Sequence, residues 1–201
     1  MVIIMEEIYN ELISSLTERY KSMLKQFRPC KPGREFLEQN LITLLGHEFL
    51  LKFPTGIAYA EVPFISVDDG EWKSRLDGYL ATSEFGFLVE AKGSKSQQDL
   101  FNSIKSDLKR IFSTELKSSF VSMATGQVEN KKVDSERSYS LPKKNYGLII
   151  ADCWSEGTAK AWERNPYIDS NYDIKTHSYF MGEYSSHKYF ILSGITRQLE
   201  W

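Results

Sequence analysis

The segment at residues 87–93 constrains the fold most, because two charged side chains close an otherwise apolar strand. Residues 87–89 are apolar and predict a strand buried within a sheet, and Gly93 ends it. Side chains alternate along a strand, so Glu90 and Lys92 point to the same face. Charges at such a position are costly without partners. This cost favours a functional role for Glu90 and Lys92.

A second acid precedes this pair on a neighbouring predicted strand. Asp77 lies in residues 72–81, and a hairpin between the two strands would bring it beside Glu90. Two adjacent carboxylates repel each other unless a cation lies between them, and hard oxygen ligands suit Mg²⁺ or Mn²⁺. Lys92 could then orient or deprotonate a water, or neutralise charge on a phosphate. The pattern predicts metal-dependent phosphodiester hydrolysis centred on Asp77, Glu90 and Lys92.

An ordinary salt bridge on an edge strand is the alternative interpretation, because 26% of the chain is charged and acid-x-Lys triplets are frequent. Five further triplets fall in predicted turns, helices or loops, where we expect solvated surface positions. These triplets begin at Glu71, Asp107, Glu115, Glu129 and Asp173.

The spacing of apolar residues places the charged strand within a longer order of elements. Helices are predicted at residues 6–27, 34–49, 97–116 and 157–164. Strands are predicted at residues 57–65, 72–81, 87–92, 146–151 and 189–192, with a tight connection at 82–86. The predicted fold is α/β, with a mixed central β-sheet flanked by helices.

The length of 201 residues fits one domain better than two. Residues 1–33 are predicted to form an N-terminal helix and linker, and residues 34–116 the core with the site. The polar, charged segment 126–144 is predicted to be a flexible insertion. Residues 145–201 are expected to supply C-terminal strands and a helix.

The segments 75–80 and 87–93 resemble the two motif strands of the PD-(D/E)xK nuclease superfamily, with the resemblance covering residues 34–112. Leu76 stands where the proline of the family name would be. The resemblance implies a restriction-endonuclease-like core and Mg²⁺-dependent hydrolysis of DNA, with Mn²⁺ as a substitute ion. It implies that Asp77, Glu90 and the carbonyl of Ala91 hold the metal. Lys92 would position or activate water.

The same family carries a glutamate on the helix before these strands, and Glu38 is the residue we expect in that role. Glu38 borders the apolar stripe of its predicted helix. Glu35 and Glu48 are rivals for the position. Glu61 on the first strand is another candidate acid, although a surface position is the simpler expectation.

Composition limits the binding modes. A net charge of -2 and a pI near 6.0 argue against coating of nucleic acid by charge alone. Local side chains could still contact a nucleic-acid backbone, namely Lys95, Gln97, Gln98, Lys105 and Lys109.

The remaining features indicate where such a protein would work. Cys30 and Cys153 show no paired spacing, which favours a reducing compartment. The apolar opening of residues 2–5 is too short for a signal peptide or a membrane span. We therefore expect a cytoplasmic protein without a membrane partner.

DNA is the expected partner, with RNA as the alternative substrate and a homodimer as an open assembly state. A catalytically inactive binding or assembly protein with a nuclease-like fold is the rival function. The intact acidic pair and lysine argue against that rival, because an inactive site is free to lose them.

Overall fold

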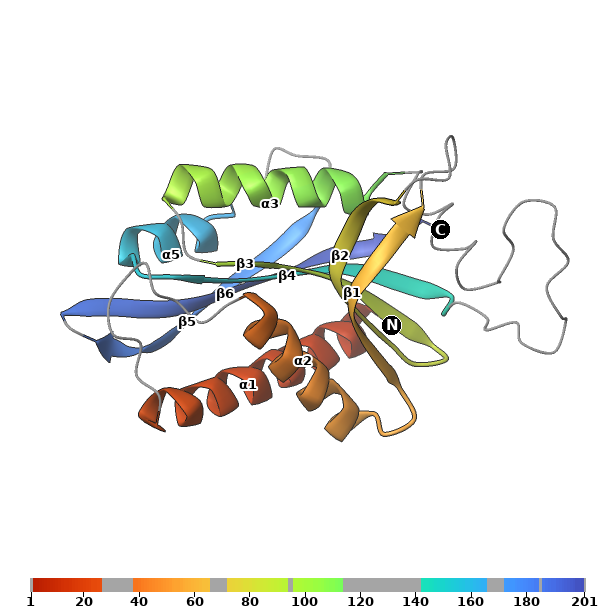
Figure 1. The fold of residues 1–201 in the computed structure, drawn as a ribbon, viewed down its shortest axis with the longest axis horizontal. Helices are drawn as coiled ribbons and strands as arrows, with labels where there is room; N and C mark the ends of the chain where they lie inside the picture. Colours follow the sequence, from red (N-terminus) through yellow and green to blue (C-terminus); the bar gives the residue numbers. More distant parts are fainter. Residues whose placement is uncertain are drawn as a thin grey trace, which may run out of the picture.

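Six strands form one sheet in the computed structural model of the protein (Figure 1). The structure describes residues 2–26, 38–65, 72–93, 96–113, 142–165, 172–184 and 186–200. The strands are β1 (Ile57–Ile65), β2 (Trp72–Ala81), β3 (Phe85–Lys92), β4 (Lys144–Cys153), β5 (Ile174–Tyr184) and β6 (His187–Leu199). The predicted mixed sheet with flanking helices is confirmed at this level.

The strand order is β1-β2-β3-β4-β6-β5. Among these strands, β3 and β4 are the one parallel pair, and every other neighbouring pair is antiparallel. Parallel strands cannot be joined by a tight hairpin and need a crossover connection. The helix α3 (Gln97–Ile111) lies between β3 and β4 in the chain and packs on both strands.

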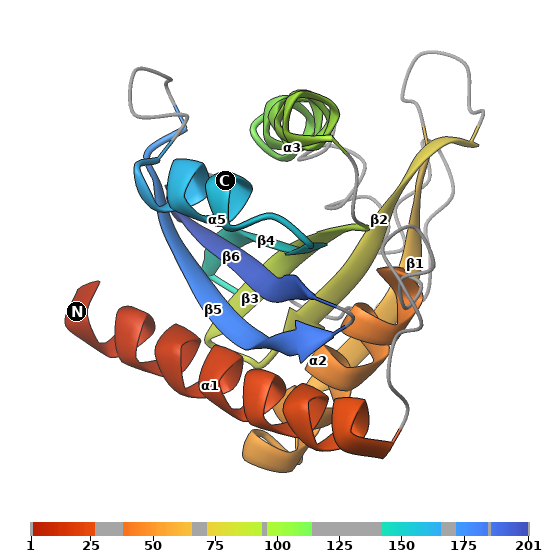
Figure 2. The ribbon, with the colours of Figure 1, turned by 90° about the vertical axis from the view of Figure 1, so that its left-hand side faces the viewer.

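Helices cover both faces of the sheet. Figures 1 and 2 show α1 (Val2–Gln26) and α2 (Glu38–Lys52) on one face, with α3 and α5 (Glu156–Glu163) on the other. Each face therefore has its own apolar core. β3 contributes to both cores, which explains why its residues 85–91 are all buried.

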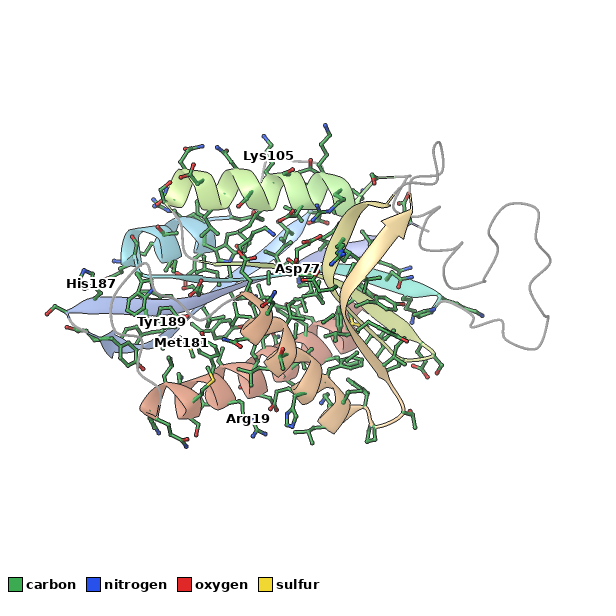
Figure 3. All side chains as sticks on the ribbon, viewed as in Figure 1. Arg19, Asp77, Lys105, Met181, His187 and Tyr189 are labelled. Atoms are coloured by element: carbon green, nitrogen blue, oxygen red, sulfur yellow. The ribbon has the colours of Figure 1, made fainter. Side chains whose placement is uncertain are left out.

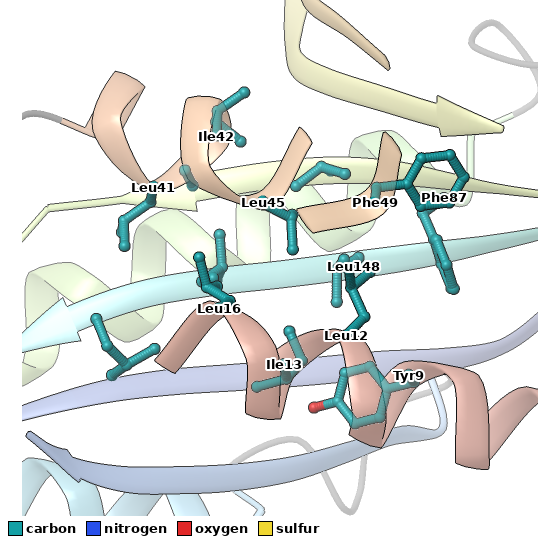
Figure 4. Packing of buried hydrophobic residues seen from close by; sticks show 14 of the residues in the cluster. Tyr9, Leu12, Ile13, Leu16, Leu41, Ile42, Leu45, Phe49, Phe87 and Leu148 are labelled. Atoms are coloured by element: carbon teal, nitrogen blue, oxygen red, sulfur yellow. The ribbon is translucent and has the colours of Figure 1, made fainter. Parts of the chain in front are cut away.

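The core beneath α1 and α2 is the larger of the two clusters. One stripe of α1 is buried at three- and four-residue steps, the spacing typical of an amphipathic helix. It meets α2 and the sheet in Figure 4, and its members are Met5, Tyr9, Leu12, Ile13, Leu16, Tyr20 and Leu24. The Tyr9 and Ser193 hydroxyls share a hydrogen bond of 2.6 Å, and those of Tyr20 and Tyr189 share one of 3.0 Å. Polar groups thus fix α1 on β6.

The opposite core lies beneath α3 and α5. The apolar stripe of α3 consists of Leu100, Ile104, Leu108 and Ile111. Ser96 caps this helix by accepting a hydrogen bond of 3.2 Å from the Asp99 N–H. Trp162 of α5 is fully buried, and its indole N–H donates to the Ser193 carbonyl at 2.9 Å. Both helices are therefore anchored through their inner faces.

The C-terminal strands differ from the prediction. No strand was predicted at residues 174–184, where β5 lies, and β6 continues to Leu199 rather than ending at residue 192. Ser193 and Thr196 interrupt the apolar run of β6, yet both are buried, and Thr196 accepts a hydrogen bond of 2.8 Å from the Gly147 N–H. Satisfied polar groups thus allow a strand to continue past its apolar run.

Smaller differences occur elsewhere. β3 begins at Phe85, inside the predicted connection, and α3 ends at Ile111, before the predicted residue 116. The predicted insertion at 126–144 lies outside the described residues as far as residue 141. Within the described part of the chain, no helix is both long and apolar enough to cross a bilayer.

Leu45 and Leu51 of α2 provide a matched test of the core beneath α1. Leu45 is fully buried, whereas Leu51 is 59% exposed. We expect Leu45→Ala to lower the free energy of unfolding by about 2–5 kcal/mol, through lost burial and a residual cavity. Leu51→Ala should change it by less than about 0.5 kcal/mol. Urea unfolding followed by circular dichroism measures both, and equal losses would contradict this packing.

Candidate functional site

Asp77, Glu90 and Lys92 lie together at the end of β3, on the face covered by α3. The register pairs Gly78 of β2 with Val89 of β3, and one further step brings Asp77 opposite Glu90. Val89 packs in the core beneath α1 and α2. Because alternate side chains point to opposite faces, Glu90 and Lys92 face α3. The predicted proximity of the three residues is therefore found.

The Lys92 ammonium lies between three carboxylates. Its Nζ is 2.9 Å from Asp107 Oδ2, 3.6 Å from Asp77 Oδ2 and 3.8 Å from Glu90 Oε2. It also donates a hydrogen bond of 2.9 Å to the Ala91 carbonyl. Its side chain is only 13% exposed. A cation thus occupies the point that these acidic groups share.

Asp77 is fixed by the backbone of β3. The Ala91 N–H donates a hydrogen bond of 2.7 Å to Asp77 Oδ2. The Asp77 side chain is 28% exposed, which makes it more open than Glu90 or Asp107. It therefore lies on the side of the cluster that water reaches.

Glu90 is the buried acid of the cluster, with a side chain 1% exposed. Its Oε1 forms an ion pair with Nη2 of Arg110 on α3. The same Nη2 lies 2.9 Å from Asp107 Oδ1. Among the described residues, Glu90 Oε2 accepts no hydrogen bond. A buried carboxylate oxygen in this state retains capacity for a further ligand.

Asp107 and Arg110 were missed by the sequence analysis, and the expectation that Asp107 is a solvated surface residue was wrong. Asp107 is 6% exposed and contacts both cations of the cluster. It lies seven residues after Leu100 and four before Ile111, on the buried stripe of α3. Helical spacing could therefore have identified it as an inward-facing acid.

Glu38 lies next to the cluster, as the first residue of α2. Its Oε1 accepts a hydrogen bond of 2.7 Å from the N–H of Gly93, the residue that follows Lys92. The helix before the strands thus brings a glutamate to the end of β3. Glu38 is tied to the backbone there, and its role in chemistry stays a prediction.

The rival acids lie elsewhere or outside the described residues. Glu48 accepts a hydrogen bond of 2.8 Å from Nε of Arg19 on α1, which places it at the α1–α2 contact; Arg19 is labelled in Figure 3. Glu61 is 48% exposed and pairs with Arg75 at 3.2 Å, a surface arrangement as expected. Glu35 lies outside the described residues.

The titration behaviour of the cluster reflects its burial. Burial raises the pKa of Glu90 to about 8, aided by Asp107, although Arg110 opposes the shift. Burial also raises the pKa of Asp107 against the opposing effect of Lys92. For Lys92, burial favours the neutral amine, but Asp107, Asp77 and Glu90 outweigh it and the pKa is raised. Lys92 is therefore an ammonium at neutral pH.

The donor atoms fit a hard divalent cation in type. Asp77, Glu90 and the Ala91 carbonyl offer oxygen ligands of the kind that Mg²⁺ takes, and Glu90 Oε2 accepts no hydrogen bond within the described residues. In that same part of the chain, no group of three or more His, Cys, Asp or Glu side chains is arranged as a metal site. Lys92 fills the shared position instead.

The residues expected to contact a nucleic-acid backbone are spread along α3. Lys105 and Lys109 are exposed, as are Gln97 and Gln98. Figure 3 shows Lys105 on the outer side of α3, while Asp77 lies on the sheet side. Lys95 lies outside the described residues. Contact between these side chains and nucleic acid stays a prediction.

Comparisons with protein-family models, with curated proteins and with solved structures found no match for this chain.

The raised pKa of Glu90 predicts a pH-dependent effect of Glu90→Gln on stability in EDTA. A group whose pKa is raised by folding contributes stability below its unfolded value, near 4.5, and loses it as pH rises toward 8. Gln keeps the shape and stays neutral. We expect the melting temperature of the variant, relative to wild type, to rise between pH 5 and pH 9.

Glu84→Gln is the matched control, because Glu84 is exposed. Its melting temperature relative to wild type should stay level across the same range. Scanning calorimetry at both pH values measures the difference. If the melting temperature of Glu90→Gln relative to wild type also stayed level, burial would not control the pKa of the Glu90 carboxyl.

Proposed function

We propose that this protein is a metal-dependent nuclease that hydrolyses DNA phosphodiester bonds and that its core is restriction-endonuclease-like. The observation that carries the proposal is the convergence of Asp77, Glu90 and Lys92 at the end of β3. Three groups with these chemistries meet where water reaches Asp77, whose side chain is 28% exposed. Such a set of two acids and a lysine suits hydrolysis of a phosphate ester.

The order of elements supports the proposal. A helix with Glu38 at its start precedes three antiparallel strands, and α3 then leads to β4, which pairs in parallel with β3. The resemblance noted in the sequence implies a helix with a glutamate, then a strand with the aspartate, a strand with Glu-x-Lys and a further helix, and α2, β2, β3 and α3 follow one another in that order. Asp77 and Glu90 occupy the strand positions that the resemblance assigns to the metal ligands.

Asp77, Glu90 and the Ala91 carbonyl would hold the Mg²⁺ ion. When bound, the ion supplies Lewis-acid polarisation of the phosphate and lowers the pKa of a coordinated water. Lys92 lies between these carboxylates, so it would have to move for an ion to bind between them. Glu38 keeps the end of β3 in place through the Gly93 N–H.

The protonation state of Lys92 sharpens its role. An ammonium cannot accept a proton from water, and although burial opposes it, the neighbouring acids, Asp107 first, raise the pKa of Lys92. We therefore assign Lys92 to orienting the attacking water and neutralising charge that develops on the phosphate. Asp107 is a positioning residue, since its Oδ2 lies 2.9 Å from the ammonium.

DNA cleavage assays test this proposal directly. We expect the wild type to cleave plasmid, linear or single-stranded DNA in Mg²⁺ or Mn²⁺, and to be inactive in EDTA. Asp77→Asn and Lys92→Met should each lower the rate by about 100-fold or more, because metal binding and positioned charge are lost. Gel analysis of product formation against time provides the measurement.

Lys21→Met is the matched control for Lys92→Met. Lys21 lies on α1, on the opposite face of the sheet, and pairs with Glu18 of the same helix. The Lys21→Met protein should cleave DNA at the wild-type rate. Full activity in the Asp77→Asn protein would contradict the assignment of Asp77 as a metal ligand. An RNA substrate belongs in the same panel, because RNA is the alternative substrate.

One observation favours a binding or assembly protein as the second candidate. Lys92 and Arg110 already pair with all three carboxylates, so the cluster is largely neutralised without a metal. We expect Mg²⁺ at millimolar concentration to raise the melting temperature of a nuclease, because a ligand of the folded state stabilises it. No shift in thermal unfolding, together with no cleavage, would favour the second candidate.

A further inference from the structure

We propose that Arg110 is an exchangeable counter-ion of the site: it holds Glu90 in the metal-free protein, leaves Glu90 when a divalent cation binds, and then binds the substrate phosphate. This inference rests on the proposed nuclease function and adds a phosphate-binding residue to it.

The contacts of Arg110 carry the first step. Its Nη2 pairs with Glu90 Oε1 and lies 2.9 Å from Asp107 Oδ1. Arg110 therefore contacts one oxygen of an expected metal ligand. A divalent cation on Glu90 would repel the guanidinium at Oε1 and compete with it for that oxygen.

The burial of Glu90 explains why an exchange partner is present. A carboxylate with a side chain 1% exposed is costly to keep ionised without a nearby cation. Arg110 supplies that cation in the metal-free protein. A divalent ion brings two positive charges and takes oxygen ligands, and Glu90 Oε2 accepts no hydrogen bond from the described residues. Replacement of one cation by the other therefore leaves Glu90 compensated.

Asp107 determines where Arg110 goes. Its two oxygens serve both cations, with Oδ1 toward Arg110 and Oδ2 toward Lys92. Asp107 is not among the expected metal ligands, so it can keep the guanidinium at the site after Glu90 is released. Arg110 then remains near the cluster with capacity to bind an anion.

Exposure makes Arg110 the cation that faces the substrate. Its side chain is 32% exposed, against 13% for Lys92. It belongs to the last turn of α3, which ends at Ile111. A guanidinium presents several N–H donors in one plane and binds phosphate through two of them, whereas an ammonium acts as a point charge. Arg110 thus suits binding of a phosphate that arrives from solvent.

Mg²⁺ binding to the Arg110→Gln protein tests the exchange without any turnover. Gln is neutral and can still donate to one carboxylate, so the fold should persist, which circular dichroism checks. With the competing ion pair removed, we expect the Kd for Mg²⁺ to fall by roughly 10-fold. Isothermal titration at pH 8.5, where protons compete least for the carboxylates, measures it.

Lys105→Gln is the matched control, because it removes a cation from the outer side of the same helix. Its Kd for Mg²⁺ should stay within about twofold of wild type, since salt screens the effect of an exposed charge on the carboxylates. An unchanged or higher Kd in Arg110→Gln would overturn the exchange, because it would make Arg110 a support for the metal ligands rather than their competitor.

Arg110→Lys separates the two roles and keeps a cation beside Glu90. We expect its Kd for Mg²⁺ to stay within about twofold of wild type, while its affinity for a short DNA duplex in Ca²⁺ falls about 10-fold through loss of the two-donor contact. Fluorescence anisotropy measures duplex binding. Unchanged DNA affinity would overturn the phosphate role. If the wild type bound no Mg²⁺, the proposed function would fail along with this inference.

Discussion

The parallel pairing of β3 with β4 is the constraint on which the rest of the structure depends. β3 pairs antiparallel with β2 on one side and parallel with β4 on the other. Because β3 and β4 run in the same direction, the chain must cross over the sheet between them. That crossing includes α3, which covers the face where Glu90 and Lys92 point. The same feature that completes the sheet therefore brings Asp107 and Arg110 onto the charged end of β3. The crossover between β3 and β4 therefore shapes both the fold and the candidate site.

Burial then decides the charge balance of the site. Glu90 and Asp107 lie in the layer between α3 and the sheet, where an unpaired carboxylate is costly. Two cations, Lys92 and Arg110, compensate the three acids of the cluster, and each cation contacts more than one acid. The pKa of Glu90 is raised despite its pairing with Arg110, so the compensation is incomplete. The site thus combines a buried acid, Glu90, with an accessible one, Asp77.

Local patterns in the sequence predicted most of the helices and strands, and also the proximity of Asp77, Glu90 and Lys92, because both depend on short-range spacing. Alternation along β3 placed Glu90 and Lys92 on one face, and the hairpin with β2 brought Asp77 to them. β5 was missed because it pairs only with β6 among the described strands, and just two of its side chains, Ile174 and Met181, are buried. A strand at the edge of a sheet needs no apolar run.

Asp107 was missed for a different reason. It was interpreted through its immediate neighbours, as one of several acid-x-Lys triplets, whereas its position on α3 is set by the stripe from Leu100 to Ile111. The spacing along one helix could have indicated that Asp107 faces inward. It could not have indicated that Lys92 and Arg110 would flank it, since that contact depends on the crossover between β3 and β4. Local patterns thus identify the charged groups, and the topology of the sheet determines which of them compensate one another.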